Sequence, residues 1–150
     1  MDGDELSGLI QQRWEILHRL LEISRKQMHA IESGQMSDLM RILSEKQRPL
    51  NDLFAIADQL RVAMDDDPER RHWSTASSRQ RCREQQNDCE QMHLELLAIE
   101  AECESNLSRN RQQVQERLAK VDAGWQAASG YAESSPSATT GGRLDLSSDR

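Results

Sequence analysis

The chain has 150 residues, of which 36% are hydrophobic and 30% are charged, and its formal net charge is −7. This length is enough for one domain and rarely for two. The acidic balance argues against nucleic acid as a partner, because binding to phosphates needs clustered Lys and Arg side chains. The local basic run Arg79, Arg81 and Arg83 is offset by the acidic residues that follow it.

The beginning of the chain and its cysteines indicate where the protein works. Residues 1–5 are acidic and lack the basic segment and apolar stretch of a secretory signal. No apolar run approaches the roughly 20 residues that a membrane-spanning helix needs, so we expect no membrane insertion. The three cysteines, Cys82, Cys89 and Cys103, are an odd number and fit a reducing compartment. We therefore expect a cytoplasmic protein.

The first predicted helix covers residues 4–33. After Leu6 and Ile10, its apolar residues recur with alternating spacings of 4 and 3, which is a heptad seam interrupted once, at Ser24. The seam consists of Leu6, Ile10, Trp14, Leu17, Leu21, Met28 and Ile31. Gly34 follows the last seam residue, at the position where a left-handed helix cap is usual.

The second predicted helix covers residues 37–64, with Ser37 as its N-cap. Its seam is Leu39, Leu43, Lys46, Leu50, Leu53, Ala57, Leu60 and Met64, in which Lys46 is the one charged residue. Pro49 lacks a backbone donor and predicts a kink or a short break. Two helices of similar length joined by a very short turn predict an antiparallel hairpin.

A third, much longer helix is predicted over residues 79–127, after Asp67 and Pro68 have started a new helical turn. Its seam contains the three cysteines and continues to Trp125. At about 49 residues, or roughly 73 Å, it is longer than the hairpin can cover, so its distal half needs another partner.

Together these elements predict an all-α fold, an antiparallel helical hairpin plus a long third helix in an elongated, coiled-coil-like bundle. Strand formers are scarce, and one Phe, one Tyr and three Trp are too few for a thick core. We expect a single domain over residues 1–129. Residues 130–150 are predicted to be a disordered tail, because they cannot bury enough apolar surface to offset the entropy of ordering.

Residues that could carry chemistry are few. The cysteine spacings of 7 and 14 favour a buried seam over a zinc site, whose ligands usually come in close pairs. Glu15 with His18, and Glu90 with His93, resemble the Glu-x-x-His element of di-iron bundles, but they flank the seams and lack the further glutamates. No phosphate-binding loop or nucleophile elbow appears. We predict no enzyme activity, no cofactor and no metal site.

The turn between the first two helices carries a family motif. It reads Ile31-Glu32-Ser33-Gly34-Gln35-Met36, followed by Leu39, Leu43, Glu45-Lys46-Gln47, Leu50 and Leu53. This pattern resembles the FlgN-type flagellar export chaperones, in which such a turn leads into a Leu-rich helix with a central Lys-Gln pair. Gly130-Tyr131 and Gly141-Gly142-Arg143 are similar to the end of many such chaperones. Pro49 and the seam cysteines depart from the pattern.

The resemblance implies a chaperone that binds the terminal helices of flagellar hook-associated proteins (the hook–filament junction subunits) and delivers them to the export apparatus. In the family the client-binding surface lies in the C-terminal helical region. On this chain that region corresponds to Leu107, Val114, Leu118, Val121 and Trp125. The alternatives are a self-associating coiled-coil adaptor, in which the third helix pairs with its own copy as a homodimer, and a di-iron carboxylate bundle protein.

Overall fold

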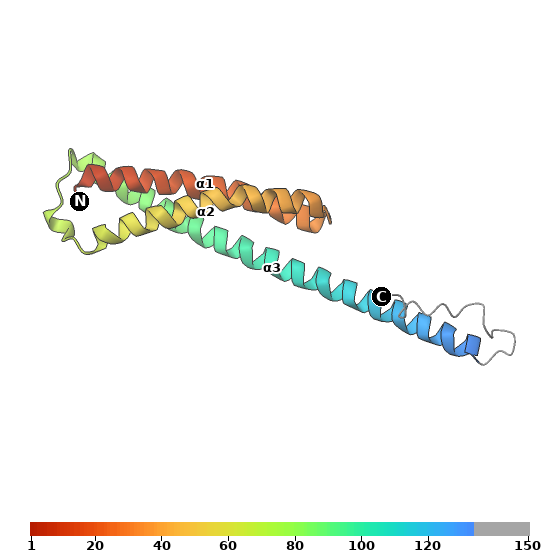
Figure 1. The fold of residues 1–150 in the computed structure, drawn as a ribbon. Helices are drawn as coiled ribbons and strands as arrows, with labels where there is room; N and C mark the ends of the chain where they lie inside the picture. The colour runs from red at the N-terminus through yellow and green to blue at the C-terminus, as the bar shows by residue number, and fades with distance from the viewer. Residues whose placement is uncertain (134–150) are drawn as a thin grey trace, which may run out of the picture. The chain divides into compact units, whose positions relative to one another are not determined.

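The computed structural model describes residues 1–133, which form an all-α protein (Figure 1). The elements are α1 (Gly3–Glu32), α2 (Met36–Met64), the short 3-10 helix η1 (Pro68–Arg70) and α3 (Ala76–Glu133). No strand occurs in residues 1–133, and α1 and α2 run side by side in opposite directions, so the predicted fold class is confirmed. The predicted disordered tail lies outside the described residues, except for residues 130–133, which are helical.

The first compact unit covers residues 1–107, and a second unit starts at residue 108. The first unit contains α1, α2, η1 and the beginning of α3. The second unit begins within α3. The single domain over residues 1–129 stays a prediction.

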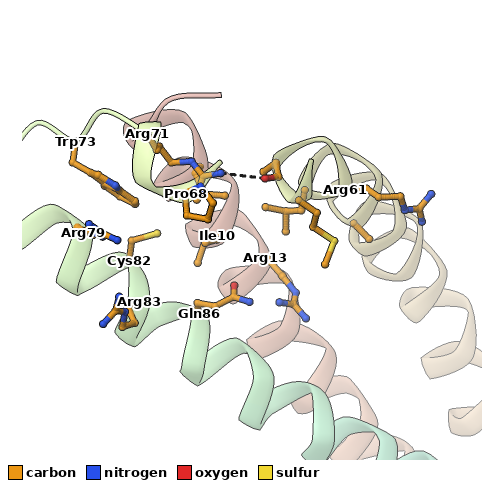
Figure 2. Close-up of a pocket in the computed structure, with 15 residues that line it drawn as sticks. Ile10, Arg13, Arg61, Pro68, Arg71, Trp73, Arg79, Cys82, Arg83 and Gln86 are labelled. Atoms are coloured by element: carbon orange, nitrogen blue, oxygen red, sulfur yellow. Dashed lines mark hydrogen bonds between the residues drawn. The ribbon is translucent and has the colours of Figure 1, made fainter. Parts of the chain in front are cut away.

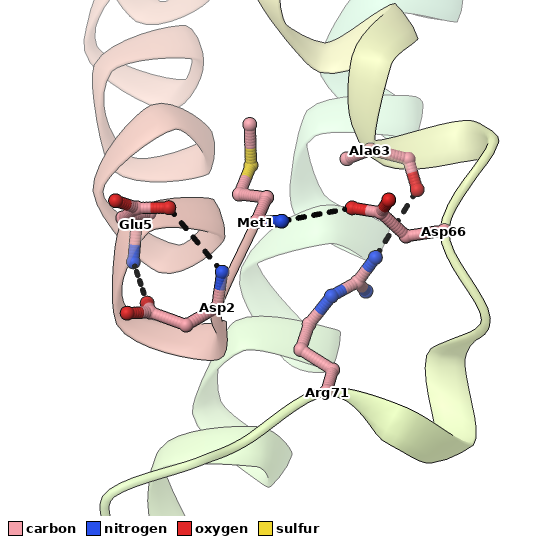
Figure 3. A network of polar contacts seen from close by, with 6 residues as sticks. All are labelled: Met1, Asp2, Glu5, Ala63, Asp66 and Arg71. Atoms are coloured by element: carbon pink, nitrogen blue, oxygen red, sulfur yellow. Dashed lines mark hydrogen bonds and ion pairs between the residues drawn. The ribbon is translucent and has the colours of Figure 1, made fainter.

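Helix α1 is held at its beginning by a reciprocal capping pair (Figure 3). The Asp2 carboxylate accepts a hydrogen bond from the backbone N–H of Glu5 at 2.8 Å, and the Glu5 carboxylate accepts one from the N–H of Asp2 at 3.3 Å. This capping box satisfies donors that the first helical turn leaves without partners. The helix ends before Gly34, whose φ of 68° confirms the predicted left-handed turn.

The beginning of α1 also docks onto the loop that follows α2. The Met1 amino group forms an ion pair with Asp66 at 3.0 Å (Figure 3). The backbone N–H of Gly3 donates to the carbonyl of His72 at 2.7 Å. A Cβ at position 3 would overlap the ring of Trp73 and lie 2.6 Å from that carbonyl, so only glycine fits there.

Helix α2 corrects two details of the prediction. It begins at Met36, so Ser37 lies inside the helix and its predicted role as N-cap is wrong; Gln35 is the N-cap residue, without a side-chain capping bond. The left-handed Gly34 reverses the chain tightly enough for α2 to begin at once, with the N–H of Gln35 bonded to the Ala30 carbonyl at 2.9 Å. The helix continues through Pro49, so the predicted break does not occur, and the proline side chain, which lacks a backbone N–H, is fully buried.

The buried face of α2 differs from the predicted seam by one residue at alternate positions. Leu39 and Lys46 are buried as predicted, but Ile56 and Ala63 are buried in place of Ala57 and Met64. The line through Leu39, Lys46, Leu53 and Leu60 has apolar or small residues on both sides, so the heptad pattern alone does not select between them. Leu43, Leu50, Ala57 and Met64 lie on one side, and Ile42, Pro49, Ile56 and Ala63 lie on the other. Packing against the rest of the first unit selects the side that carries Ile42, Pro49, Ile56 and Ala63.

Helix α3 begins at Ala76, earlier than the predicted residue 79, because the Thr75 hydroxyl accepts a hydrogen bond from the N–H of Ser78 at 3.0 Å and caps it. Its buried residues include all three cysteines, as the seam predicts. Two apolar clusters form the core of the first unit. The first joins Ile10, Leu17, Leu20 and Leu21 to Cys82, Cys89 and Leu96, and the second joins Ile23, Ala30, Ile31, Leu39 and Ile42 to Cys103.

A polar network crosses this core and contacts all three helices. Lys46 of α2 is buried, and its Nζ contacts the carboxylate of Glu100 and donates to the side-chain oxygen of Gln27 at 3.0 Å. The Ser24 hydroxyl donates to the same Glu100 carboxylate at 2.9 Å. Lys46 and Ser24, the polar residues of the two predicted seams, therefore meet one acidic residue of α3. A satisfied network of this kind favours one register of the three helices over others.

Candidate functional site

The residues predicted to bind a client occupy two environments. Val114, Leu118, Val121 and Trp125 belong to the second unit and are 52%, 63%, 56% and 71% exposed, respectively. Leu107 belongs to the first unit, where it is half-buried against the second apolar cluster. The structure therefore leaves four of the five side chains more than half exposed to solvent.

These four side chains form one apolar row along α3. Their spacings of 4, 3 and 4 residues place them on the same helical face. Every side chain from residue 111 to residue 130 is exposed, including these large apolar ones. We call Val114, Leu118, Val121 and Trp125 the apolar row. It presents a seam of the width that a second amphipathic helix could cover.

The cysteines are buried and unsuited to nucleophilic chemistry. Burial raises the pKa of the Cys82, Cys89 and Cys103 thiols above the ordinary value of 9.0. For Cys82 a hydrogen bond from Ser7 and the nearby Arg71 charge act in the opposite direction, but less strongly. A thiol with a raised pKa holds little thiolate near neutral pH, and thiolate is the reactive and metal-binding form.

The Glu-x-x-His pairs lie apart from any cluster of ligands. His18 is exposed, stacks on Trp14 with ring centroids 5.3 Å apart, and lies 3.5 Å from the Glu22 carboxylate. Glu90 is exposed. Within residues 1–133 no group of three or more His, Cys, Asp or Glu side chains is arranged to hold a metal ion.

An open cleft in the first unit is a feature that sequence reasoning missed. It has a volume of about 570 Å³ and lies where the beginning of α1, the end of α2, η1 and the beginning of α3 meet (Figure 2). Its lining includes Arg13, Arg61, Arg71, Arg79 and Arg83. These arginines are dispersed over 71 positions of sequence, from 13 to 83, so only the short run at 79–83 gave a signal.

Comparison with protein families gives one result: the profile described as FlgN protein matches residues 1–139. The chain belongs to the FlgN family. This confirms the resemblance carried by the Gly34 turn and the Lys46-Gln47 pair. FlgN proteins are flagellar export chaperones and are not an enzyme family. Comparison with curated proteins and with solved structures gave no significant match.

The two residues of the Lys46-Gln47 pair lie in different environments. Lys46 is buried in the polar network with Gln27 and Glu100, whereas Gln47 is exposed. The lysine of the pair therefore belongs to the buried core of this chain.

Among the described residues, none of the helices is long and apolar enough to cross a membrane.

Proposed function

We propose that this protein is a cytoplasmic chaperone that binds flagellar hook-associated proteins and delivers them to the type III export apparatus. The client would lie on the apolar row, with Leu107 at one end. No chemical step is required. The row would cover the apolar helix through which the client assembles, and would release that helix at the export apparatus.

The observation that carries this proposal is the exposure of the apolar row. Each of its four large side chains is more than half exposed, on a stretch of helix where every neighbour is exposed as well. Contiguous apolar surface of this kind commonly marks a binding site. The heptad spacing suits a helical partner, because the side chains of such a row pack between those of a facing helix.

The charges beside the row suit the same kind of partner. Arg117 and Asp122 lie one position from Leu118 and Val121, at the edges of the helical face. Charged residues at such edges commonly set the orientation and choice of a partner helix. Affinity would come mainly from the apolar side chains, and the flanking charges would contribute mainly to specificity.

The test replaces Val114, Leu118 and Val121 together with Ser in the full chain. We expect binding to hook-associated proteins encoded by the same genome to weaken at least about a hundredfold, since burying each such side chain is worth about 1.5–3 kcal/mol. Isothermal titration calorimetry would measure the affinity. Circular dichroism should show that helicity is nearly unchanged, because none of the three side chains is buried.

A matched control places three serines on the opposite face of the same helix, as Gln112→Ser, Ala119→Ser and Ala123→Ser. All three positions are exposed. We expect this variant to bind clients as the wild type does. Equal affinity of the two variants for the client would show that the apolar row is not the client-binding surface.

The apolar row also fits a second copy of this chain, which is the self-associating alternative. Light scattering on the free protein over a range of concentrations distinguishes the two. If the row holds a homodimer, the apparent molecular mass of the free protein should fall toward that of the monomer in the Val114, Leu118 and Val121 variant. If the row binds only clients, the apparent molecular mass of the free protein should be the same in both.

A further inference from the structure

The cleft in the first unit has an apolar floor. Ile10 and Cys82 are buried there, and Leu6, Leu60 and Trp73 are half-buried beside them. Ala57 and Ala63 of α2 also line the cleft, with side chains that end at Cβ. A cleft of about 570 Å³ with such a floor can receive one or two apolar side chains of a partner.

The rim of this cleft is basic, although the chain as a whole is acidic. Five arginines line it, contributed by α1, α2, the loop after η1, and α3: Arg13, Arg61, Arg71, Arg79 and Arg83. Among the described residues no Asp or Glu is part of the lining. Arg61 and Arg79 are paired with carboxylates, so the positive field that favours anions at this cleft comes mainly from Arg13, Arg71 and Arg83.

The five arginines of the lining differ in whether a carboxylate of the described residues already pairs with them. Arg61 pairs with Asp58 at 3.2 Å and Arg79 with Glu69 at 3.8 Å. Arg13 and Arg83 form no ion pair with any residue in 1–133.

Arg71 is the arginine most constrained by its surroundings. Its Nη2 donates to the Ala63 carbonyl at 3.1 Å (Figure 3), which holds the side chain in place. Its Nε is buried and has no hydrogen-bond partner among the described residues. A buried donor without an acceptor costs free energy, and because this Nε is closed to solvent, a carboxylate would reach it only after the atoms that cover it move.

We propose that this arginine-lined cleft binds an acidic, amphipathic peptide segment of a protein partner. An apolar side chain of the segment would pack on Ile10, Leu60 and Trp73, and its carboxylates would bind Arg13, Arg71 and Arg83. Guanidinium groups present paired N–H donors that match the two oxygens of a carboxylate. An anion without apolar groups would make no favourable contact with the apolar floor, so the segment must carry both acidic and apolar side chains.

A nucleic acid fits the cleft less well. A polyanion would be repelled by the rest of this acidic chain, whose net charge as a whole is −7, and among the described residues Trp73 is the one aromatic side chain in the lining. This inference does not depend on the client-binding proposal, because the cleft residues are all in the first unit and the apolar row is in the second. The protein would then carry two separate protein-binding surfaces.

The first test uses three labelled ten-residue peptides and fluorescence anisotropy with the full chain. One peptide repeats pairs of Glu and Leu, the second has Gln in place of Glu, and the third has Ser in place of Leu. We expect the Glu/Leu peptide to bind at least about tenfold more tightly than either control, because charge and apolar contact are both needed. Equal binding of the Gln/Leu peptide, or tight binding of a duplex DNA oligomer, would overturn the proposal.

The second test changes the cleft in the protein. The double variant Arg13→Gln and Arg83→Gln should weaken binding of the Glu/Leu peptide about tenfold or more. The control Arg48→Gln and Arg81→Gln removes the same charge from exposed arginines outside the lining and should bind as the wild type does. If both variants lost peptide affinity to a similar extent, the loss would follow from the change in net charge, which would contradict a binding site in the cleft.

A third variant tests the apolar part of the cleft without changing its charges. Ala57 is exposed and lines the cleft, so Ala57→Trp fills it without changing any charge. We expect this variant to keep its helicity and to lose peptide binding to the same extent as the double arginine variant. Unchanged peptide affinity in Ala57→Trp would show that the peptide does not enter the cleft.

Discussion

Residues 1–107 and residues 108–130 present similar apolar spacing in opposite environments. In the first unit, Leu17 and Cys89 are fully buried in apolar clusters. In the second, Leu118 and Val121 follow the same kind of spacing and are more than half exposed. A heptad row therefore indicates that a helix has a face to cover, while the covering surface can come from the same chain or from another molecule.

The two regions also differ in how polar residues are used. The first unit encloses Lys46 with Gln27 and Glu100, so that a charge helps to define the packing of three helices. In the second unit the charged side chains from residue 111 to residue 130 are all exposed. The first region therefore has the features of a scaffold, and the second those of a surface available for binding.

The largest expected contrast compares one leucine from each region. Leu17→Ala should lower the free energy of unfolding by about 3–4 kcal/mol, because it leaves a cavity in a fully buried site. Leu118→Ala should change it by no more than about 0.5 kcal/mol, since the side chain is exposed. Urea denaturation followed by circular dichroism would measure both. A large loss of stability in Leu118→Ala would mean that the chain itself covers the apolar row.

The next contrast concerns buried charge. Lys46→Ala should destabilise the protein by about 3 kcal/mol, because it leaves Gln27 and Glu100 without their shared partner. Lys120→Ala, at an exposed position of the second unit, should alter stability by no more than about 0.5 kcal/mol. The same denaturation experiment compares them. If the two lysine variants were equally stable, the network would contribute nothing to the first unit.

The smallest effect is the pH dependence contributed by the cysteines. Burial raises the pKa of all three thiols, so the folded state keeps thiol protons that the unfolded state loses above the ordinary pKa of 9.0. Their contribution to stability is therefore fully present below about pH 9 and declines as the pH rises further. We expect the urea midpoint to fall more between about pH 8 and about pH 10 in wild type than in a variant with all three cysteines changed to Ala.

The burial of the three cysteines can also be tested by their reactivity. A thiol reagent at neutral pH should react slowly with the folded wild type and rapidly once urea unfolds it, since burial limits both access and thiolate formation. Fast reaction of all three thiols in the folded protein would show that the first unit opens readily.

Much of the architecture was predictable because it depends on local signals. Gly34 occupies a left-handed turn that disfavours other residues, and Asp67 followed by Pro68 favours the start of a helical turn. The seam cysteines follow from helical periodicity alone. The Ser37 cap was wrong because the Gly34 turn brings the chain into α2 sooner than a side-chain cap would require.

The sequence by itself determined the helical class, the hairpin turn, the family and the positions of the apolar row, since periodicity, turn chemistry and motif are properties of neighbouring residues. Only the tertiary structure decided which side of the α2 seam is buried, because apolar residues flank both sides and packing selects one. It also decided that Lys46 meets Ser24, Gln27 and Glu100, and that five dispersed arginines surround one apolar cleft. These arrangements join residues far apart in the chain, and no local pattern contains the distances between them.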